Sequence, residues 1–260
     1  MQIDEPLVPA KIKAVISPHN AARLSGIDVF DTIDSTNSWL LQQAKMGVPS
    51  GQVCLAEQQT AGRGRLGKSW YSPPGANLYC SLLWRFEALT QDLSGLGIAV
   101  GIMVVLALER YGIVSGLELK WPNDVLAMGR KLSGILIETN GATHVVIGIG
   151  LNLDVRDAHE KNWIDLLELT GTRPERNFLA GLLLNELFEK IPQFEQFGLA
   201  PFLPLWQKRD ALLDRTVFVF AGQQKIVGVM RGINAAGELL LENETGIQSF
   251  RYGEVSVLPQ

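Results

Sequence analysis

Residues 61–84, "AGRGRLGKSWYSPPGANLYCSLLW", decide which fold classes this chain can adopt. The start of this stretch satisfies two nucleotide-loop patterns at once. Its three glycines, at positions 62, 64 and 67, fit the G-x-G-x-x-G of dinucleotide-binding folds, and Lys68 and Ser69 complete the G-x-x-x-x-G-K-[ST] of phosphate-binding loops. Both patterns need a helix that begins at or within the glycines, because the helix N-terminus faces the phosphates.

Two prolines exclude that helix. Pro73 and Pro74 would fall within its first two turns, where proline costs about 3 kcal/mol or more and the residue before it avoids helical angles. No apolar repeat of helical period follows, and "ANLYCSLLWRF" predicts a strand instead. The sequence therefore favours neither a Rossmann fold nor a P-loop fold, and predicts a loop followed by a strand.

The chemical content of this loop is its cations. Arg63, Arg65 and Lys68 lie within six residues, with no acidic residue between Ala61 and Trp70. Like charges at this spacing repel one another, whereas an ion pair 4 Å apart at a partly shielded site is worth about 4 kcal/mol. We therefore expect the loop to close over an anionic ligand; a solvated surface turn is the alternative.

The overall composition is that of a folded globular protein, with 47% hydrophobic residues, 19% charged residues and a formal net charge of −4. This charge does not suggest a surface that attracts DNA or anionic membranes as a whole. Cys54 and Cys80 lie in apolar stretches without a C-x-x-C pair, which favours reduced, buried thiols in a cytoplasmic protein. His19, His144 and His159 lack metal-ligand spacing, so no metal site is predicted.

Hydrophobic periodicity predicts strands and helices over most of the chain after a weakly patterned start of about 25 residues. Strands are expected at "QVCLAEQQ", "ANLYCSLLWRF" and "THVVIGIGLNLD", and a polar, mobile segment is expected at 155–162. Helices are expected to open at Ser35 or Thr36, to cover 93–108, and to cover "GTRPERNFLAGLLLNELFEKI" with Pro174 near the first turn. The uncharged run 93–108 is shorter than the roughly 20 residues that span a bilayer, so it predicts a buried helix.

The chain changes character near residue 212, where short alternating strands separated by "AGQQ", "NAAG" and "ENETG" begin. This pattern predicts a small all-β barrel. The predicted fold class is α+β: a mixed β-sheet with flanking helices, followed by the small C-terminal all-β barrel. We expect an N-terminal extension over 1–26, the main domain over 27–211 and the barrel over 212–260.

A second polar cluster lies in "KWPNDVLAMGRKLSG". If the segment folds back as a hairpin at Met128–Gly129, Lys131 returns beside Asn123 and Asp124. A lysine there can hold a phosphate and a carboxylate together, as attack of an acid on the α-phosphate of a nucleoside triphosphate requires. An ordinary ion pair at a strand end explains the same residues, and both interpretations stay open.

A third polar cluster is "DSTN", at the predicted helix start. Ser35, Thr36 and Asn37 can cap the helix. Small hydroxyl groups beside exposed backbone N–H groups also bind carboxylates and compact polar rings.

Together these segments resemble the biotin–protein ligase family. "DSTNSWL", "AEQQTAGRGRLGKSWYSPPGANLYCSLLW", "KWPNDVLAMGRKLSGILIE" and "VVIGIGLNL" occur in the family's order and approximate spacing, and the barrel with "GVMRGINAAGELLLE" is similar to the family's C-terminal domain. The resemblance covers Ile27 to Gln260 and implies a class II aminoacyl-tRNA-synthetase/biotin-ligase-like catalytic domain over 27–211. Biotin and ATP would form biotinyl-5′-AMP, and the biotinyl group would pass to a lysine of the biotin carboxyl carrier protein domain of acetyl-CoA carboxylase.

The resemblance also implies roles for individual positions. The implied biotin-binding residues are Ser35, Thr36, Asn37, Gln59, Arg63, Gly64, Arg65, Lys131, Gly134, Gly148 and Gly150. The implied ATP- and adenylate-binding residues are Arg65, Lys68, Trp70, Asn123, Asp124, Lys131, Asn152 and Trp163. Lys131 and Arg65 are the implied catalytic residues. Mg²⁺ is expected to accompany ATP, and a homodimer through a sheet edge is implied, with no DNA or membrane partner.

Two departures from the family pattern bear on function. Lys68 stands where the family loop often has an arginine, which keeps the charge and removes bidentate phosphate binding. The extension before Ile27 is too short for the DNA-binding domain of larger bacterial members, so we expect the monofunctional type. Two rivals remain: a lipoate or octanoate protein ligase or transferase, and a non-catalytic biotin-binding regulator.

Overall fold

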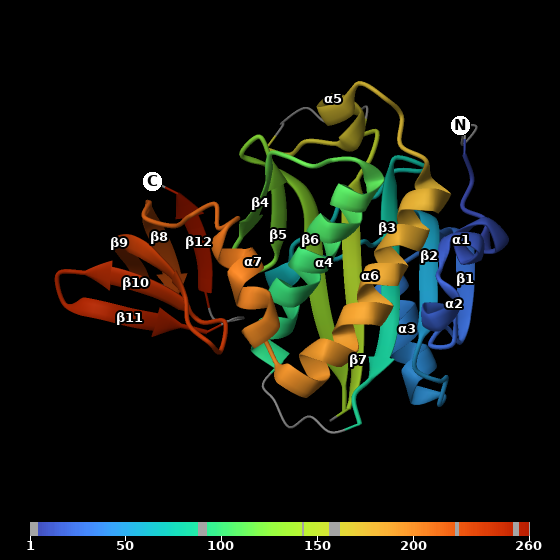
Figure 1. Ribbon diagram of the computed structural model, residues 1–260, viewed down its shortest axis with the longest axis horizontal. Coiled ribbons are helices and arrows are strands. Elements are labelled where there is room, and N and C mark those ends of the chain that lie inside the picture. Colours follow the sequence, from blue (N-terminus) through green and yellow to red (C-terminus); the bar gives the residue numbers. More distant parts are fainter. Residues whose placement is uncertain are drawn as a thin grey trace.

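The computed structural model describes residues 5–87, 93–141, 143–155, 162–221, 224–251 and 255–259. Its main part is a seven-stranded sheet with helices on both faces, and a five-stranded sheet follows at the C-terminal end (Figure 1). The predicted α+β class is therefore confirmed. The predicted mobile segment falls largely on residues 156–161, which lie outside the described residues. Across the described residues, no helix is both long enough and apolar enough to span a membrane.

The seven-stranded sheet has the order β1-β2-β3-β7-β6-β5-β4. Its strands are β1 Gly26–Ile33, β2 Gln52–Gln59, β3 Asn77–Arg85, β4 Leu117–Lys120, β5 Asp124–Ala127, β6 Arg130–Asn140 and β7 His144–Asn152. Only the β1–β2 pair is parallel; the other pairs are antiparallel. The outer side of β4 is occupied, because Leu119 pairs with the segment 209–211.

The two faces of this sheet bury different partners. Side chains that alternate along a strand point to opposite faces, so Val53 and Leu55 join the main core while Cys54 joins a smaller cluster. The main core packs under α4 Leu96–Tyr111 and α6 Arg176–Phe197, which lie side by side across the sheet in Figure 1. The smaller cluster packs under α3 Thr36–Lys45 on the other face. Because α3 is short, part of that face stays uncovered beyond its N-terminus.

The loop over residues 61–70, called here the glycine–arginine loop, contains no regular helix, as Pro73 and Pro74 predicted. Arg65–Gly67 form a single 3₁₀ turn in which Leu66 adopts φ 54°, and Lys68 is extended. The loop closes on itself, because Trp70 donates its N–H to the Gly62 carbonyl at 2.9 Å. A glycine is required at position 62, where a Cβ would lie 2.6 Å from the Trp70 carbonyl oxygen.

The β5–β6 hairpin forms as predicted. Met128 and Gly129 have φ values of 52° and 71°, which is the turn geometry that matches the twist of two antiparallel strands. The register pairs Leu126 with Lys131 and Asp124 with Gly134. The hairpin therefore returns Lys131 to the side of Asp124.

The C-terminal sheet has the order β11-β10-β9-β8-β12 and is antiparallel throughout. Its strands are β8 Thr216–Ala221, β9 Gln224–Ile233, β10 Leu239–Asn243, β11 Gly246–Phe250 and β12 Val255–Pro259. The turn between β9 and β10 packs into the main part, where Trp121 donates its indole N–H to the Gly237 carbonyl at 3.0 Å. The buried indole thus links the "KWPND" segment to this sheet.

The helices differ from expectation mainly at the two ends of the main part. The first residues form two short helices, α1 Pro9–Val15 and α2 Pro18–Ala21, which the sequence did not reveal because neither is two full turns of apolar repeat. Helix α6 starts after Pro174, continues through Pro192 and leaves Phe178 exposed. The remaining helical segments are 3₁₀ turns at Leu93–Gly95 and Ala200–Phe202, and the helices α5 Leu166–Thr170 and α7 Leu203–Gln207.

Candidate functional site

A cavity of about 290 Å³ lies on the uncovered part of the sheet, at the N-terminus of α3. Its wall combines the start of α3, the end of β2, the glycine–arginine loop, the "KWPND" segment, and strands β3, β6 and β7. Val257 of β12 also lines it, so the C-terminal sheet contributes to the same cavity. All three polar clusters expected from the sequence meet here.

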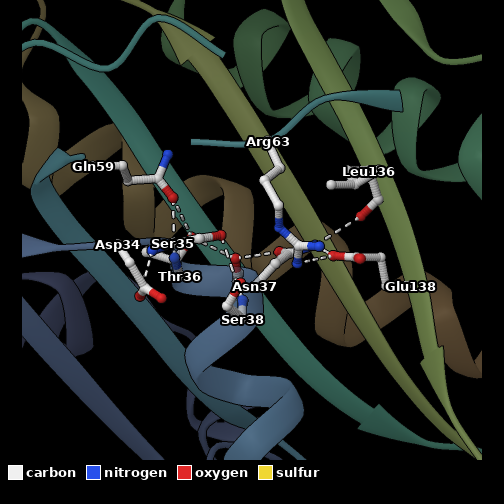
Figure 2. A network of polar contacts seen from close by, with 10 residues as sticks. Asp34, Ser35, Thr36, Asn37, Ser38, Gln59, Arg63, Leu136 and Glu138 are labelled. Carbon is white, nitrogen blue, oxygen red and sulfur yellow. Dashed lines mark hydrogen bonds and ion pairs between the residues drawn. The ribbon is translucent and has the colours of Figure 1, made fainter. Parts of the chain in front are cut away.

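One end of the cavity is lined mainly by uncharged polar groups around the start of α3, which belong to a network that Asp34, Arg63 and Glu138 complete (Figure 2). The Gln59 Oε1 atom accepts hydrogen bonds from the Thr36 N–H at 3.0 Å and from the Thr36 hydroxyl at 3.1 Å. The Ser81 hydroxyl lies 2.6 Å from Asn37 Oδ1 and 2.7 Å from Thr36 Oγ1. Ser35 caps the helix through Ser38 N–H, so "DSTN" forms both a cap and a pocket wall.

Three glycines on β6 and β7 make room for this wall. A Cβ on Gly148 would lie 2.3 Å from Asn37 Oδ1, and a Cβ on Gly150 would lie 2.4 Å from the Trp70 ring. A Cβ on Gly134 would lie 2.9 Å from the same ring. The glycines therefore let Asn37 and the Trp70 indole lie directly against the sheet.

The other end of the cavity is cationic. Lys131 Nζ lies 2.7 Å from Asp124 Oδ1 and 5.2 Å from the centroid of the Trp70 ring. Arg65 donates to Asn123 Oδ1 at 3.1 Å, and Asn123 is held in turn by the Ile135 carbonyl at 2.8 Å. Within the described lining, Asp124 is the single carboxylate beside five lysine and arginine side chains. This end is built to receive negative charge.

Lys120 lines the same cavity, and its pKa is shifted first by burial and then by the neighbouring charges. Burial lowers the pKa of its ammonium group below the usual value, the nearby Asp124 carboxylate opposes the shift, and Lys131 and Lys68 add to it. The charged form of Lys120, which burial disfavours, is stabilised when an anion binds beside it.

A second cavity, of about 370 Å³, lies on the other side of the loop and is lined by residues 63–68 and 136–138. Glu138 of β6 stands at this side and pairs with Arg63 at 2.6 Å. The loop thus lines both cavities. Its Arg63 is attached to β6 by this ion pair (Figure 2).

The structure brings nearly all of the expected site residues together. The cavity is lined by Ser35, Thr36, Asn37, Gln59, Arg63, Gly64, Arg65, Lys68, Trp70, Asn123, Asp124, Lys131, Gly134, Gly148 and Gly150. Asn152 and Trp163 are not in this lining. Asn152 donates to the carbonyls of Lys131 and Ile164, and Trp163 bridges to the Lys131 backbone, so both lie next to Lys131.

Several lining residues were missed by the sequence analysis. They include Tyr79, Ser81, Leu136 and Val257, whereas Lys120 of the predicted "KWPND" cluster lines the cavity as well. Ser81 carried a usable signal, because a serine in the apolar strand "LYCSLLW" needs a hydrogen-bond partner when buried. Val257 carried none, since only the packing of the two sheets places it at the cavity.

Comparisons with known proteins agree with this geometry. Residues 29–152 match the Biotin/lipoate A/B protein ligase family, and residues 213–258 match the Biotin protein ligase C terminal domain. The chain is 40% identical to the Bifunctional ligase/repressor BirA of Escherichia coli (strain K12), covering 96% of this chain and 80% of that protein. It is 36% identical to the Biotin--[acetyl-CoA-carboxylase] ligase of Mycobacterium tuberculosis (strain ATCC 25618 / H37Rv), covering 83% of each.

A solved structure gives the same result. The biotin protein ligase from Aquifex aeolicus in complex with biotin and ATP superposes with a TM-score of 0.82 at 29% identity, covering 91% of this chain and all of that one. A second crystal structure of the Aquifex aeolicus protein superposes with a TM-score of 0.78 at 26% identity, with the same coverage of both chains.

Proposed function

The chain belongs to the biotin protein ligase family, and we propose that it activates biotin with ATP to biotinyl-5′-AMP and transfers the biotinyl group to a lysine of the biotin carboxyl carrier protein of acetyl-CoA carboxylase. One observation carries this proposal: an uncharged polar wall and a cationic wall face each other across one cavity of about 290 Å³. A carboxylic acid with a polar ring and a nucleotide phosphate can therefore be held against each other.

The polar end is the proposed biotin site. Ser35, Thr36, Asn37 and Gln59 offer both donors and acceptors at the start of α3, as a compact polar ring requires. The Trp70 indole, which lies against Gly134 and Gly150, supplies the apolar wall for the ring and its chain. Proposed additional biotin contacts are Arg63, Gly64, Arg65, Lys131 and Gly148.

The cationic end is the proposed adenylation site. A carboxylate oxygen of biotin attacks the α-phosphorus of ATP, the α–β bridging bond breaks, and pyrophosphate leaves with the bond electrons. Lys131, oriented by Asp124 at 2.7 Å, holds the two mutually repelling anions close together, and Arg65 stabilises the charge that develops at the phosphate. In the second step, the carrier lysine amine attacks the acyl carbon, AMP leaves, and an amide forms.

The nucleotide is proposed to lie along Lys68, Trp70, Asn123 and Asp124, with Asn152 and Trp163 next to Lys131. Lys120 adds a further phosphate contact. Mg²⁺ would arrive with the triphosphate: Asp124, the single carboxylate of the described lining, is already paired, so phosphate oxygens and water are its expected ligands.

The direct test is mass spectrometry of a biotin carboxyl carrier domain incubated with this protein, biotin and ATP. We expect a single added mass of one biotinyl group on one lysine, which appears only when ATP is present. A carrier domain left unmodified, or modified equally well with lipoate in place of biotin, would overturn the assignment. The "GRGRLGKSW" and "KWPND" segments support biotin over lipoate, and the retained Lys131 supports an enzyme over a non-catalytic regulator.

We further propose a cytoplasmic homodimer that forms through β1. This strand ends the seven-strand order and carries exposed positions at Asp31 and Thr32, whereas the opposite edge at β4 is already paired with 209–211. The buried free thiols of Cys54 and Cys80 suit a reducing compartment. Sedimentation of a variant with proline in β1 would test the interface, and an unchanged dimer would exclude it.

A further inference from the structure

One chain of polar contacts begins and ends on the glycine–arginine loop. From the loop's C-terminal end, the Trp70 carbonyl accepts from the Ser72 hydroxyl at 2.9 Å, and Ser72 Oγ accepts from Gln59 Nε2 at 3.1 Å. Gln59 holds Thr36, and Ser81 lies between Thr36 and Asn37, as described above. Asn37 then donates to Glu138 Oε2 at 2.9 Å.

Glu138 closes this chain onto the other end of the loop. Arg63 lies 2.6 Å from the same Oε2 atom that accepts from Asn37 (Figure 2). Asn37 is fixed in turn, because it is only 4% exposed, accepts at Oδ1 from Ser81 and lies against Gly148. Asn37, on the polar floor of the cavity, therefore orients the Glu138 carboxylate toward Arg63.

We propose that Glu138 is a positioning residue that couples the closed position of the glycine–arginine loop to the polar floor of the cavity. Its carboxylate holds Arg63, and through Arg63 it holds the loop backbone that covers the cavity. Because the same oxygen also orders Asn37, a ligand that engages Asn37 strengthens the attachment of the loop. Glu138 touches neither proposed substrate, and its role in retaining biotinyl-5′-AMP rests on the proposed function.

The chain offers a matched control for an ion pair of this kind. Arg231 and Glu242 lie 2.6 Å apart on neighbouring strands of the C-terminal sheet, away from the cavity. The arginines of the two pairs are similarly exposed, at 39% and 41%. Glu242→Gln therefore reports what the loss of one such carboxylate contact does by itself, with Arg231 still paired to Asp214.

Trypsin measures loop opening without any substrate, because the loop carries its own cleavage site at the Arg65–Leu66 bond. We expect Glu138→Gln to raise the rate of cleavage at this bond about threefold, the size of effect expected from a partly exposed ion pair. High salt should raise the wild-type rate toward that of the variant. Glu242→Gln should leave the cleavage rate unchanged. The double variant Arg63→Gln with Glu138→Gln should be cleaved no faster than either single variant.

Retention of the intermediate gives the second measurement. After preincubation with biotin and ATP, release of biotinyl-5′-AMP should be about threefold faster from Glu138→Gln than from wild type. If wild type forms no adenylate, the proposed function fails, and trypsin cleavage still decides the role of Glu138. Loop cleavage equal to that of wild type, or raised cleavage along the whole chain with a lowered melting temperature, would overturn the inference.

Discussion

Lys131 is the residue on which the proposed chemistry depends most. It is placed by two independent contacts, the Asp124 carboxylate at 2.7 Å and the Trp70 ring at 5.2 Å. The sequence could predict this placement, because the turn at Met128–Gly129 fixes which residues the hairpin returns to Asp124. The sequence left open whether the pair served chemistry or only strand pairing. The surrounding lysines and arginines favour chemistry.

Lys131→Ala should abolish adenylation. The loss of a group that holds both reacting anions should lower the rate by about 10² to 10³-fold, as seen when a preorganised charge-stabilising donor is removed. The rate at which biotinyl-5′-AMP forms in a single turnover, followed by mass spectrometry, checks this. Lys45→Ala, at an exposed position in the last turn of α3, is the control and should keep full activity. Adenylation within threefold of wild type in Lys131→Ala would contradict the assignment.

Gly150→Ala should impair biotin binding. The added Cβ would lie 2.4 Å from the Trp70 ring, which must move away from the sheet. Overpacking of this kind costs about 1–3 kcal/mol, so the biotin dissociation constant should rise roughly 5-fold to 150-fold. Isothermal titration measures it. Gly101→Ala is the control, since its Cβ would meet only side-chain ends, Leu119 Cδ2 at 3.3 Å and Ile135 Cδ1 at 3.9 Å. Equal affinities in the two variants would refute the role of Gly150.

Lys120 should give the ATP reaction an alkaline limit below the ordinary lysine range. Its pKa is lowered from 10.5, mainly by burial, so its positive charge is present at low pH and is lost as pH rises through the lowered pKa. The value of kcat/KM for ATP, which reports the free enzyme, should therefore decrease as pH rises through the lowered pKa of Lys120. Lys120→Arg should move the fall to higher pH. A fall at the same pH in both proteins would exclude Lys120 as its cause.

The elements show which parts of the fold the sequence could predict. Strand β2 runs over Gln52–Gln59, the residues of the predicted "QVCLAEQQ" strand, and the hairpin formed where expected, because each has a strong period or a decisive turn. The helix predicted over 93–108 formed as α4 Leu96–Tyr111, after a 3₁₀ turn at Leu93–Gly95. Helices α1 and α2 were missed because they are short and owe their position to tertiary contacts. Gly181 of α6 shows this, since a Cβ there would lie 2.4 Å from Val15 of α1.

The polar chain through Glu138 was also beyond prediction from the sequence. Its members come from α3, β2, β3, β6 and the loop, so it exists only after the sheet has formed. The part of this chain in "DSTN" could be recognised as a local motif in the sequence. Glu138 in "GILIETN" could not, because it resembles an ordinary strand residue. Local spacing identifies caps and turns, and it does not identify contacts between distant strands.

A buried ion pair ties the N-terminal segment to the main sheet. Arg176 at the start of α6 lies 2.6 Å from Glu57 of β2, and it also donates to the carbonyls of Glu5 and Asn77. Arg176→Met should lower the free energy of unfolding by about 3–5 kcal/mol, because Glu57 would remain buried and unpaired. Urea denaturation measures this. Arg176→Met combined with Glu57→Met should recover part of the loss, and a single variant as stable as wild type would contradict this account.

At the scale of the whole molecule, the cavity is shared by the two sheets. Val257 of β12 lines it, and Trp121 beside Asn123 is held by the Gly237 carbonyl of the C-terminal sheet. The C-terminal sheet therefore packs against the proposed nucleotide end of the site and helps to hold it in place.

In the proposed reaction, one cavity joins biotin to the α-phosphate of ATP. Exchange of labelled pyrophosphate into ATP tests it most directly, because exchange requires reversible formation of an acyl-adenylate in the cavity and needs no carrier protein. We predict exchange that depends on biotin, that lipoate does not support, and that Lys131→Ala abolishes. Exchange supported by lipoate alone, or biotin binding with no exchange at all, would contradict the account.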